Sequence, residues 1–298
     1  MNKMKQCAAL ILGSCFSFAA SNASAELIYG TTVGRDLIRF DSATPGTISS
    51  VPITGLVGQL AGEQIAGIDF RPASGALYAW SNAPGSLYRL YTLDLTSGAA
   101  TRVPGNIDQT ISGGVFWGVD FNPAADRLRL VNDNNTSLRY NQLTGLLAAT
   151  DTSLNPASNV VAAAYDRNDT DPGTLTTLFA IDSASDSLVR IGGVDGTPSP
   201  NGGLVTTIGA LGFNTAGETQ FDISQAGVAY AALSSGIGQS PSLYTVNLST
   251  GATSLVGVIG DGSLPGLTGM SAFIPVPEPS SMMLIGAGLL IGMVRRRR

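Results

Sequence analysis

Three aspartates recur at one position of a repeated motif. Asp69, Asp120 and Asp222 each lie directly before a large apolar residue in a short strand-like run. If these runs line a common channel, the three carboxylates ring it and could bind a cation or a sugar. A carboxylate beside a turn can equally accept backbone N–H groups and hold the fold together. A residue that recurs with the structural unit favours this structural interpretation.

The missing residue types limit the available chemistry. The sequence contains no histidine, and both cysteines, Cys7 and Cys15, lie in its amino-terminal segment. Histidine-dependent hydrolysis and His-ligated zinc, copper or iron are therefore excluded. Carboxylates, tyrosines, arginines and hydroxyls remain, which would suit a paired-carboxylate hydrolase or a calcium-assisted reaction on polysaccharide. The chain has only four glutamates, all in loops or at the processed ends: Glu26, Glu63, Glu218 and Glu278.

Two further groups of side chains are candidates for binding. The loop DRNDTDPG offers Asp166, Asn168 and Asp171, although it lacks the glycine and the final glutamate of an EF-hand. Calcium is the candidate ligand there, with a solvated turn as the alternative. Five aromatic residues could stack on sugar rings, but all lie in strand patterns that favour packing: Trp80, Trp117, Tyr88, Tyr91 and Tyr140.

A repeat of about 50 residues organises the chain between its two ends. The run GIDFRPASGALYAW (67–80) is echoed by GVDFNPAADRLRLV (118–131), and each is followed by two more strand-like runs. Phe70, Phe121, Tyr165 and Ile223 mark the same position in four units. The alternation of apolar and polar residues, with Gly, Asn and Asp between the runs, predicts four antiparallel strands in each unit.

The ends of the repeat region predict a closed ring. Three strand-like runs open the mature chain, and the missing first strand follows the fourth unit as GMSAFIP (269–275). Phe273 is expected in the place of Phe70, while Ala272 and Ala164 are expected in the place of the aspartate. Pairing of the two chain ends leaves no open edge. We therefore predict an all-β, five-bladed propeller with four-stranded blades.

Several of these runs resemble an uncharacterised bacterial family of exported proteins, a domain of unknown function. The similar segments include LIRFDSATPGTISSVPITGL, GIDFRPASGALYA and DFNPAADRLRLVND. The resemblance covers nearly all of residues 27–275 and supports the propeller fold, but it carries no activity. Propellers host binding, hydrolysis and scaffolding alike.

The amino-terminal segment predicts export. Two lysines precede an apolar run and the triplet Ala23-Ser24-Ala25, a typical secretory signal with cleavage by signal peptidase before Glu26. Lipidation of Cys15 is the alternative. Once this segment and the basic tail are removed, ten arginines face seventeen aspartates and three glutamates. Such an acidic chain offers no basic stripe for nucleic acid, and we expect a monomer that is kept soluble by its charge.

The carboxyl-terminal segment predicts sorting. Its apolar run, 282–294, would span roughly 20 Å as a helix, which is less than the roughly 30 Å hydrocarbon core of a membrane. The segment resembles the PEP-CTERM signal, with Pro277-Glu278-Pro279 before the run and four basic residues after it: Arg295, Arg296, Arg297 and Arg298. That resemblance implies transient anchoring in the inner membrane, cleavage by an exosortase-type peptidase and delivery to the outer surface or matrix of a Gram-negative cell. An uncleaved anchor is the alternative.

Together these features divide the chain into a signal peptide (1–25), a propeller (26–275) and a sorting signal (276–298). Missing histidine and scarce glutamate favour a non-catalytic binding or scaffold protein, whose partner would be a carbohydrate or a surface protein. A polysaccharide hydrolase or lyase that uses aspartates is the alternative. No cofactor is predicted apart from the calcium candidate.

Overall fold

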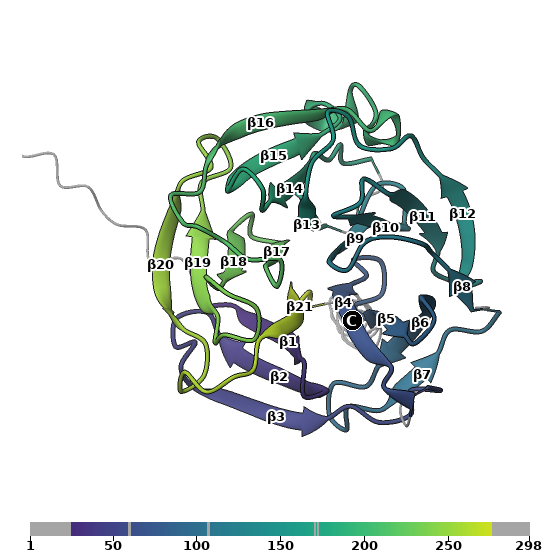
Figure 1. Ribbon diagram of the computed structural model, residues 1–298, viewed down its shortest axis with the longest axis vertical. Coiled ribbons are helices and arrows are strands. Elements are labelled where there is room, and N and C mark those ends of the chain that lie inside the picture. The colour runs from purple at the N-terminus through teal and green to yellow at the C-terminus, as the bar shows by residue number, and fades with distance from the viewer. Residues whose placement is uncertain (1–24, 59–60, 106–107, 170, 172, 276–298) are drawn as a thin grey trace, which may run out of the picture.

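The computed structural model describes residues 25–58, 61–105, 108–169, 171 and 173–275. These residues form five antiparallel sheets, arranged as blades around a central axis (Figure 1). The predicted all-β, five-bladed propeller is therefore confirmed.

Each blade is a four-stranded meander whose first strand lies on the axis and whose fourth strand lies at the rim. Blade 1 contains β21 (Leu267–Ala272), β1 (Leu27–Thr32), β2 (Asp36–Asp41) and β3 (Ile48–Pro52). Blade 2 contains β4 (Gln64–Phe70), β5 (Leu77–Ala83), β6 (Leu87–Leu93) and β7 (Ala100–Arg102), and the short β8 (Gln109–Thr110) also pairs with β6.

The remaining blades repeat this order along the chain. Blade 3 contains β9 (Trp117–Asn122), β10 (Arg127–Asn132), β11 (Ser137–Asn141) and β12 (Leu146–Thr150). Blade 4 contains β13 (Val160–Tyr165), β14 (Leu178–Asp182), β15 (Ser187–Ile191) and β16 (Val205–Ala210). Blade 5 contains β17 (Gln220–Ile223), β18 (Ala229–Leu233), β19 (Ser242–Val246) and β20 (Thr253–Val258).

Blade 1 closes the ring because it combines strands from both ends of the chain. The last strand, β21, pairs antiparallel with β1, so that Ile28 lies opposite Ala272 and Tyr29 lies opposite Ser271. Just beyond the strand, the Phe273 N–H donates to the Leu27 carbonyl oxygen at 2.8 Å. The predicted pairing of the two ends is confirmed, and it leaves no first strand without a partner.

Apolar side chains are buried between neighbouring blades rather than in one central core. Five apolar clusters occur, one at each junction between blades. The inner strands are covered on both sides, which is why the run VVAAAY of β13 is buried at every position. The rim strands β3, β12, β16 and β20 are instead largely open to solvent.

The five candidate aromatic residues all belong to these junctions. Trp80, Trp117, Tyr88, Tyr91 and Tyr140 are buried. The Trp80 ring stacks on Tyr88 at a centroid distance of 5.4 Å and lies 5.0 Å from Tyr140. The expectation that they pack between blades is confirmed, and sugar stacking on these rings is not available.

Candidate functional site

The structure brings the three repeated aspartates together on the axis. Asp69 in β4, Asp120 in β9 and Asp222 in β17 are 1–3% exposed, and a carboxylate oxygen of each lies within 4.8 Å of the others. All three bind the first strand of the next blade around the ring. Asp69 Oδ2 accepts from the Phe121 N–H at 2.7 Å, and Asp120 Oδ1 accepts from the Tyr165 N–H at 3.1 Å.

In blade 1, the hydroxyl group of Ser271 lies beside two of these carboxylates, those of Asp69 and Asp222. Asp222 Oδ2 accepts from the Ala272 N–H at 2.6 Å. The Ser271 hydroxyl lies 2.8 Å from Asp69 Oδ1 and 3.0 Å from Asp222 Oδ2, and it accepts from the Phe70 N–H. The aspartate ring, defined as Asp69, Asp120, Asp222 and Ser271, therefore ties first strands to one another across the closure of the propeller.

The expected alignment of the last strand is wrong by one residue. Ser271, not Ala272, occupies the aspartate position, and Ala272 rather than Phe273 takes the place of the following aromatic residue. Each aspartate of blades 2 and 3 follows a strand glycine by two residues, and Ser271 keeps that spacing. In blade 4 the position is Ala164, as expected.

Burial and mutual repulsion favour the protonated carboxylic acids. Burial raises the pKa of Asp69 well above its usual value, and the charge of Asp222 raises it further. Burial also raises the pKa of Asp120, followed by the charges of Asp69 and Asp222. The pKa of Asp222 is likewise raised by burial. The backbone N–H bonds act in the opposite direction without cancelling these effects.

The three carboxylates could also hold a metal ion. Calcium, the expected candidate, takes about six to eight oxygen ligands. The aspartate ring offers three carboxylates and one hydroxyl, and each carboxylate already accepts a backbone N–H. The neighbouring cavity holds about 10 Å³, close to the roughly 10–15 Å³ that one water needs. The donor set therefore falls short of a full calcium shell.

Close packing of the first strands separates the aspartate ring from the solvent at the face where these strands begin. A Cβ atom at Gly67 would lie 2.3 Å from Val119 Cγ2, and one at Gly118 would lie 2.6 Å from the Ala163 nitrogen. Only glycine permits this approach. The cavity of about 10 Å³ at this level is too small for a sugar ring, so a polysaccharide does not reach the three aspartates by this route.

A larger cavity opens where the first strands begin, on the face that we call the upper face. This mouth cavity has a volume of about 500 Å³, within the roughly 300–1,000 Å³ typical of small-molecule sites. It is bounded by the starts of β4, β9, β17 and β21, the β1–β2 turn and the β5–β6 turn. Its apolar wall includes Val33, Val115 and Phe116, and its polar wall includes Gln64, Asn82, Glu218 and Gln220.

Two polar groups of the mouth cavity are free for a ligand. The side-chain amides of Gln64 and Asn82 form no hydrogen bond with the described residues. Gln220 Nε2 donates to a backbone carbonyl of β21 at 3.4 Å. The sole acidic lining residue, Glu218, accepts from the Gly238 N–H at 2.6 Å. The cavity therefore offers neutral hydrogen-bonding groups beside an aromatic and aliphatic wall.

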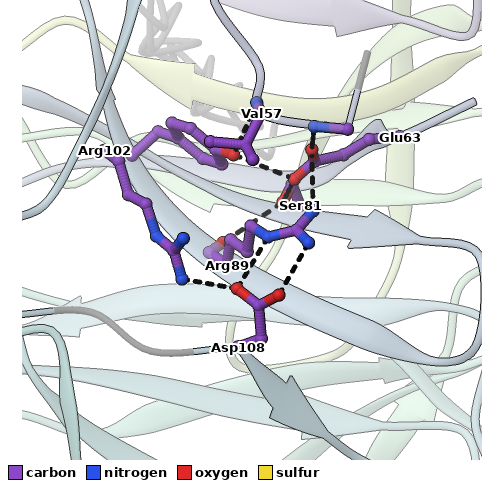
Figure 2. A network of polar contacts seen from close by, with 8 residues as sticks. Val57, Glu63, Ser81, Arg89, Arg102 and Asp108 are labelled. Carbon is purple, nitrogen blue, oxygen red and sulfur yellow. Dashed lines mark hydrogen bonds and ion pairs between the residues drawn. The ribbon is translucent and has the colours of Figure 1, made fainter. Parts of the chain in front are cut away.

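A buried ion pair joins Glu63 and Arg89 (Figure 2), next to the residues of β4 that line the mouth cavity. Glu63, directly before β4, is completely buried. Its carboxylate accepts from the Ser81 hydroxyl at 2.5 Å, Arg89 Nη1 at 2.9 Å and the Tyr91 hydroxyl at 3.1 Å. It also accepts from the Gly58 N–H at 2.5 Å, which ties the preceding loop to the blade.

Arg89 Nε and Nη2 bind Asp108, which lies in the loop between β7 and β8 (Figure 2). Arg89 forms two bonds with the Asp108 carboxylate, at 2.9 and 2.8 Å, and Arg102 adds a third at 2.5 Å. The hydrogen bonds from Arg89 are the main reason that the pKa of Asp108 falls to about 2. The sequence places Glu63 in a loop and does not predict this network. An arginine inside the apolar strand LYRLYTL was the available signal, because such a charge needs a buried partner.

In the loop proposed for calcium, each of the two candidate aspartates uses a carboxylate oxygen to accept a backbone N–H. Asp166 Oδ1 accepts from the Thr177 N–H at 2.6 Å, and Asp171 Oδ1 accepts from a backbone N–H two residues further on. Asn168 is buried and donates to the Ile223 carbonyl oxygen at 2.6 Å. Among the described residues, the three ring aspartates alone form a convergent acidic group.

The described residues next to the two terminal segments lie on the lower face, opposite the mouth cavity. The Glu26 N–H donates to Ser42 Oγ at 2.9 Å, and its carboxylate accepts from the Tyr230 hydroxyl at 2.8 Å. Other residues of the expected cleavage and sorting sites lie outside the described residues: Ala23, Pro277, Glu278, Pro279 and Arg295–Arg298. The apolar run 282–294 lies outside them as well, and no helix in the described part could cross a membrane.

Most of the chain matches one known family. Residues 36–268 match a family described as a domain of unknown function, DUF4394. The chain belongs to this family. The resemblance seen in the sequence is thereby confirmed, and the DUF4394 match falls within the propeller. A comparison with curated proteins found no match.

The tail of this DUF4394 protein matches a second description. Residues 275–298 match the PEP-CTERM protein-sorting motif, as the sequence predicts. The motif indicates export and membrane-associated sorting in a Gram-negative bacterium, and it implies processing by an exosortase-type protease.

Solved structures share the fold with the DUF4394 protein only distantly. Regucalcin, a calcium-binding protein from Agrobacterium tumefaciens, has 14% identity and a TM-score of 0.42, with coverage of 68% of this chain and 66% of that chain. A putative 6-phosphogluconolactonase from Bacteroides uniformis has 14% identity, 81% and 82% coverage and a TM-score of 0.43. Glutaminyl cyclase from Myxococcus xanthus has 12% identity, 78% and 95% coverage and a TM-score of 0.40. Similarity this low carries no functional argument.

Proposed function

We propose that this protein is an exported propeller of the cell surface or extracellular matrix that binds a neutral, hydroxyl-rich ligand without catalysis. The mouth cavity is the binding site, and a carbohydrate is the ligand class. In this proposal signal peptidase removes residues 1–25, the propeller comprises 26–275, and the sorting signal 276–298 anchors the chain transiently before it is cleaved.

The chemistry of the mouth cavity carries the proposal. The free amides of Gln64 and Asn82 can both donate to and accept from hydroxyl groups, while the Phe116 ring and the exposed Val115 offer an apolar surface to the face of a sugar. The single carboxylate, Glu218, is already hydrogen-bonded. Such a lining suits an uncharged polar ligand better than an ion.

The positions of the first and last strands of the propeller support access to this cavity. Glu26 and Phe273 lie at the lower face, where β1 begins and β21 ends. A tail anchored in the membrane would therefore hold the lower face toward the membrane. The mouth cavity at the upper face would point away from it, toward ligands outside the cell.

No observation favours the alternative of a polysaccharide hydrolase or lyase. Glycoside hydrolysis commonly needs two carboxylates that flank the scissile bond. The three ring aspartates are buried below closely packed first strands. Glu218 is the one acidic residue that lines the mouth cavity. For this reason the proposed function is binding alone.

A glycan array with the purified full chain tests this proposal, together with an assay for reducing ends on each glycan that is retained. We expect retention of one or more neutral oligosaccharides with no release of reducing sugar. Turnover of a retained glycan would contradict the non-catalytic role. A complete lack of retention of neutral glycans would contradict the carbohydrate class.

Processing of the tail is a separate prediction. Cleavage near Pro277-Glu278-Pro279 is expected to leave the cell-associated protein without its basic end, because the apolar run is short for a permanent anchor. Intact-mass measurement of protein from the native host should find a species that starts at Glu26 and lacks Arg295–Arg298. Detection of those arginines in the mature protein would instead indicate an uncleaved anchor.

A further inference from the structure

A second cavity lies on the lower face, between blades 3 and 4, separate from the mouth cavity. It has a volume of about 300 Å³, at the lower end of the roughly 300–1,000 Å³ range for small-molecule sites. Its walls come from the β9–β10 turn, strands β10 and β11, the end of β13 and the loops of blade 4. The residues that matter here are Asn122, Arg127, Arg129, Arg139 and Asn201.

The lining of this lower cavity is positively charged in an otherwise acidic protein. Arg127, Arg129 and Arg139 all line it, against one carboxylate, Asp195. Asp195 is itself bound by Arg167 at 2.5 Å. Three of the ten arginines that precede the basic tail therefore meet at one small cavity. A concave site lined by one sign of charge concentrates ions of the opposite sign.

Two of the arginines are fixed in place by the fold. Arg129 is buried and donates to Asp151 Oδ2 at 2.6 Å, to Asn201 Oδ1 at 2.5 Å and to the Tyr165 hydroxyl at 3.1 Å. Arg139 binds both oxygens of Asp151, each at 2.8 Å. Asp151 thus neutralises part of this charge and holds both guanidinium groups rigidly at the wall.

Arg127 has guanidinium N–H groups that are available to a ligand. Its Nη1 donates to the Asp126 carbonyl oxygen at 2.8 Å, and its guanidinium has no carboxylate partner among the described residues. The carboxylate of Asp126 is bound by Arg71 at 2.7 and 2.5 Å. A guanidinium with free N–H groups at the wall of a cavity can bind a carboxylate through two parallel hydrogen bonds.

Neutral donors accompany this charge. The side-chain oxygen of Asn122 accepts from the Ala125 N–H, and that of Asn201 accepts from Arg129. Their amide NH₂ groups therefore remain for a ligand. Leu175 and Pro200 add apolar surface to the wall. The lower cavity thus combines a carboxylate-binding group, neutral donors and an apolar surface in a volume that fits one small ring.

We propose that the lower cavity binds a small polyhydroxy carboxylate, the chemistry of a uronic acid, with Arg127 as the residue that binds the carboxylate. Arg129 and Arg139 act as fixed positive charges, and Asn122 and Asn201 donate to hydroxyl groups. This site is independent of the proposed function at the mouth cavity, because the two cavities share no lining residue.

Calorimetric titration of the purified full chain tests this inference with three probes: galacturonate, galactose and sulfate. We expect galacturonate to bind most tightly, because it alone carries both the carboxylate and the hydroxyls. Arg127→Gln is expected to weaken galacturonate binding at least tenfold without changing the melting temperature. Arg39→Gln, at an exposed arginine of blade 1, is the matched control and should leave binding unchanged.

Each remaining outcome would overturn the proposal. Equal binding of galactose and galacturonate would remove the role of the carboxylate, and equal binding of sulfate and galacturonate would leave only a general anion site. Undiminished galacturonate binding by the folded Arg127→Gln variant would place the ligand elsewhere, as would an equal loss in Arg39→Gln. Absence of galacturonate binding to the wild type would refute the site.

Discussion

Replacement of Glu63 by alanine is expected to lower the free energy of unfolding by about 3–5 kcal/mol, the usual cost of breaking a buried ion pair by removing one partner. Glu63 is completely buried and accepts four hydrogen bonds, including one from the buried Arg89. The variant leaves the Ser81 and Tyr91 hydroxyls without this acceptor and frees the loop at Gly58. Urea denaturation of the two proteins measures the difference.

Glu218→Ala is the matched control for this prediction. Both glutamates lie just before the first strand of a blade, but Glu218 is only half-buried and accepts one backbone N–H, from Gly238. Its loss is expected to cost about 0.5–1.5 kcal/mol, the net value of one hydrogen bond. Similar losses for the two variants would show that the Glu63 network does not hold the upper face of blade 2.

Replacement of Asp120 by asparagine is expected to stabilise the protein at pH 8, by about 1–3 kcal/mol. The pKa of Asp120 is raised by burial and by Asp69 and Asp222, so the native state binds protons that the unfolded chain has released. In the wild type, the protonated carboxyl group therefore contributes stability that is complete below the ordinary aspartate pKa of 3.8. That contribution is lost as the pH rises through the raised pKa of the native state. Each such proton contributes a slope of about 1.4 kcal/mol per pH unit in that window.

Asparagine removes the charge but keeps the oxygen that accepts from the Tyr165 N–H. The variant should therefore show a shallower fall in stability between pH 5 and pH 8, measured by urea denaturation at each pH. Asp94→Asn is the control of opposite sign, because hydrogen bonds from Ser97 lower the pKa of this exposed carboxylate. That contribution is present above the ordinary pKa and is lost on acidification, so the control should not gain stability at pH 8.

A bound cation would reverse the result for Asp120. Calcium would keep the carboxylates of the aspartate ring ionised, and removal of one ligand would then destabilise the protein. Two results together would contradict the interpretation that the ring carboxyl groups are protonated. One is a loss of stability in Asp120→Asn at pH 8, and the other is a wild-type melting temperature that falls in EDTA and recovers with calcium. We expect neither chelator nor calcium to shift the melting temperature.

The overall fold was predictable because each repeat carries its own strand pattern and because the missing first strand could be found at the other end. The error in blade 1 came from aligning Phe273 with Phe70 by residue type. Backbone spacing from the strand glycine places Ser271 with the aspartates instead, because close packing on the axis constrains the glycine more strongly than it constrains the aromatic residue.

The candidate sites were less predictable because they depend on contacts between blades. Asp69 and Asp120 could be selected from the repeat. Their separation from solvent depends on how closely neighbouring first strands approach at Gly67 and Gly118, which the sequence does not specify. The mouth cavity is assembled from separate loops that share no motif. The buried networks of Arg89 and Arg129 had a sequence signal, since both arginines interrupt apolar strands, but their partners Glu63 and Asp151 come from loops whose positions the sequence does not specify.

The central claim, ligand binding at the mouth cavity, is tested most directly by narrowing the cavity with one exposed side chain. Val115 lines it and is 65% exposed, while Val57 is 62% exposed and lies outside it. The probe is the neutral oligosaccharide most strongly retained on the array, titrated calorimetrically into wild type, Val115→Trp and Val57→Trp. We predict at least a tenfold loss of affinity for Val115→Trp and no change for Val57→Trp. Unchanged affinity in Val115→Trp, or equal losses in both variants, would contradict the account.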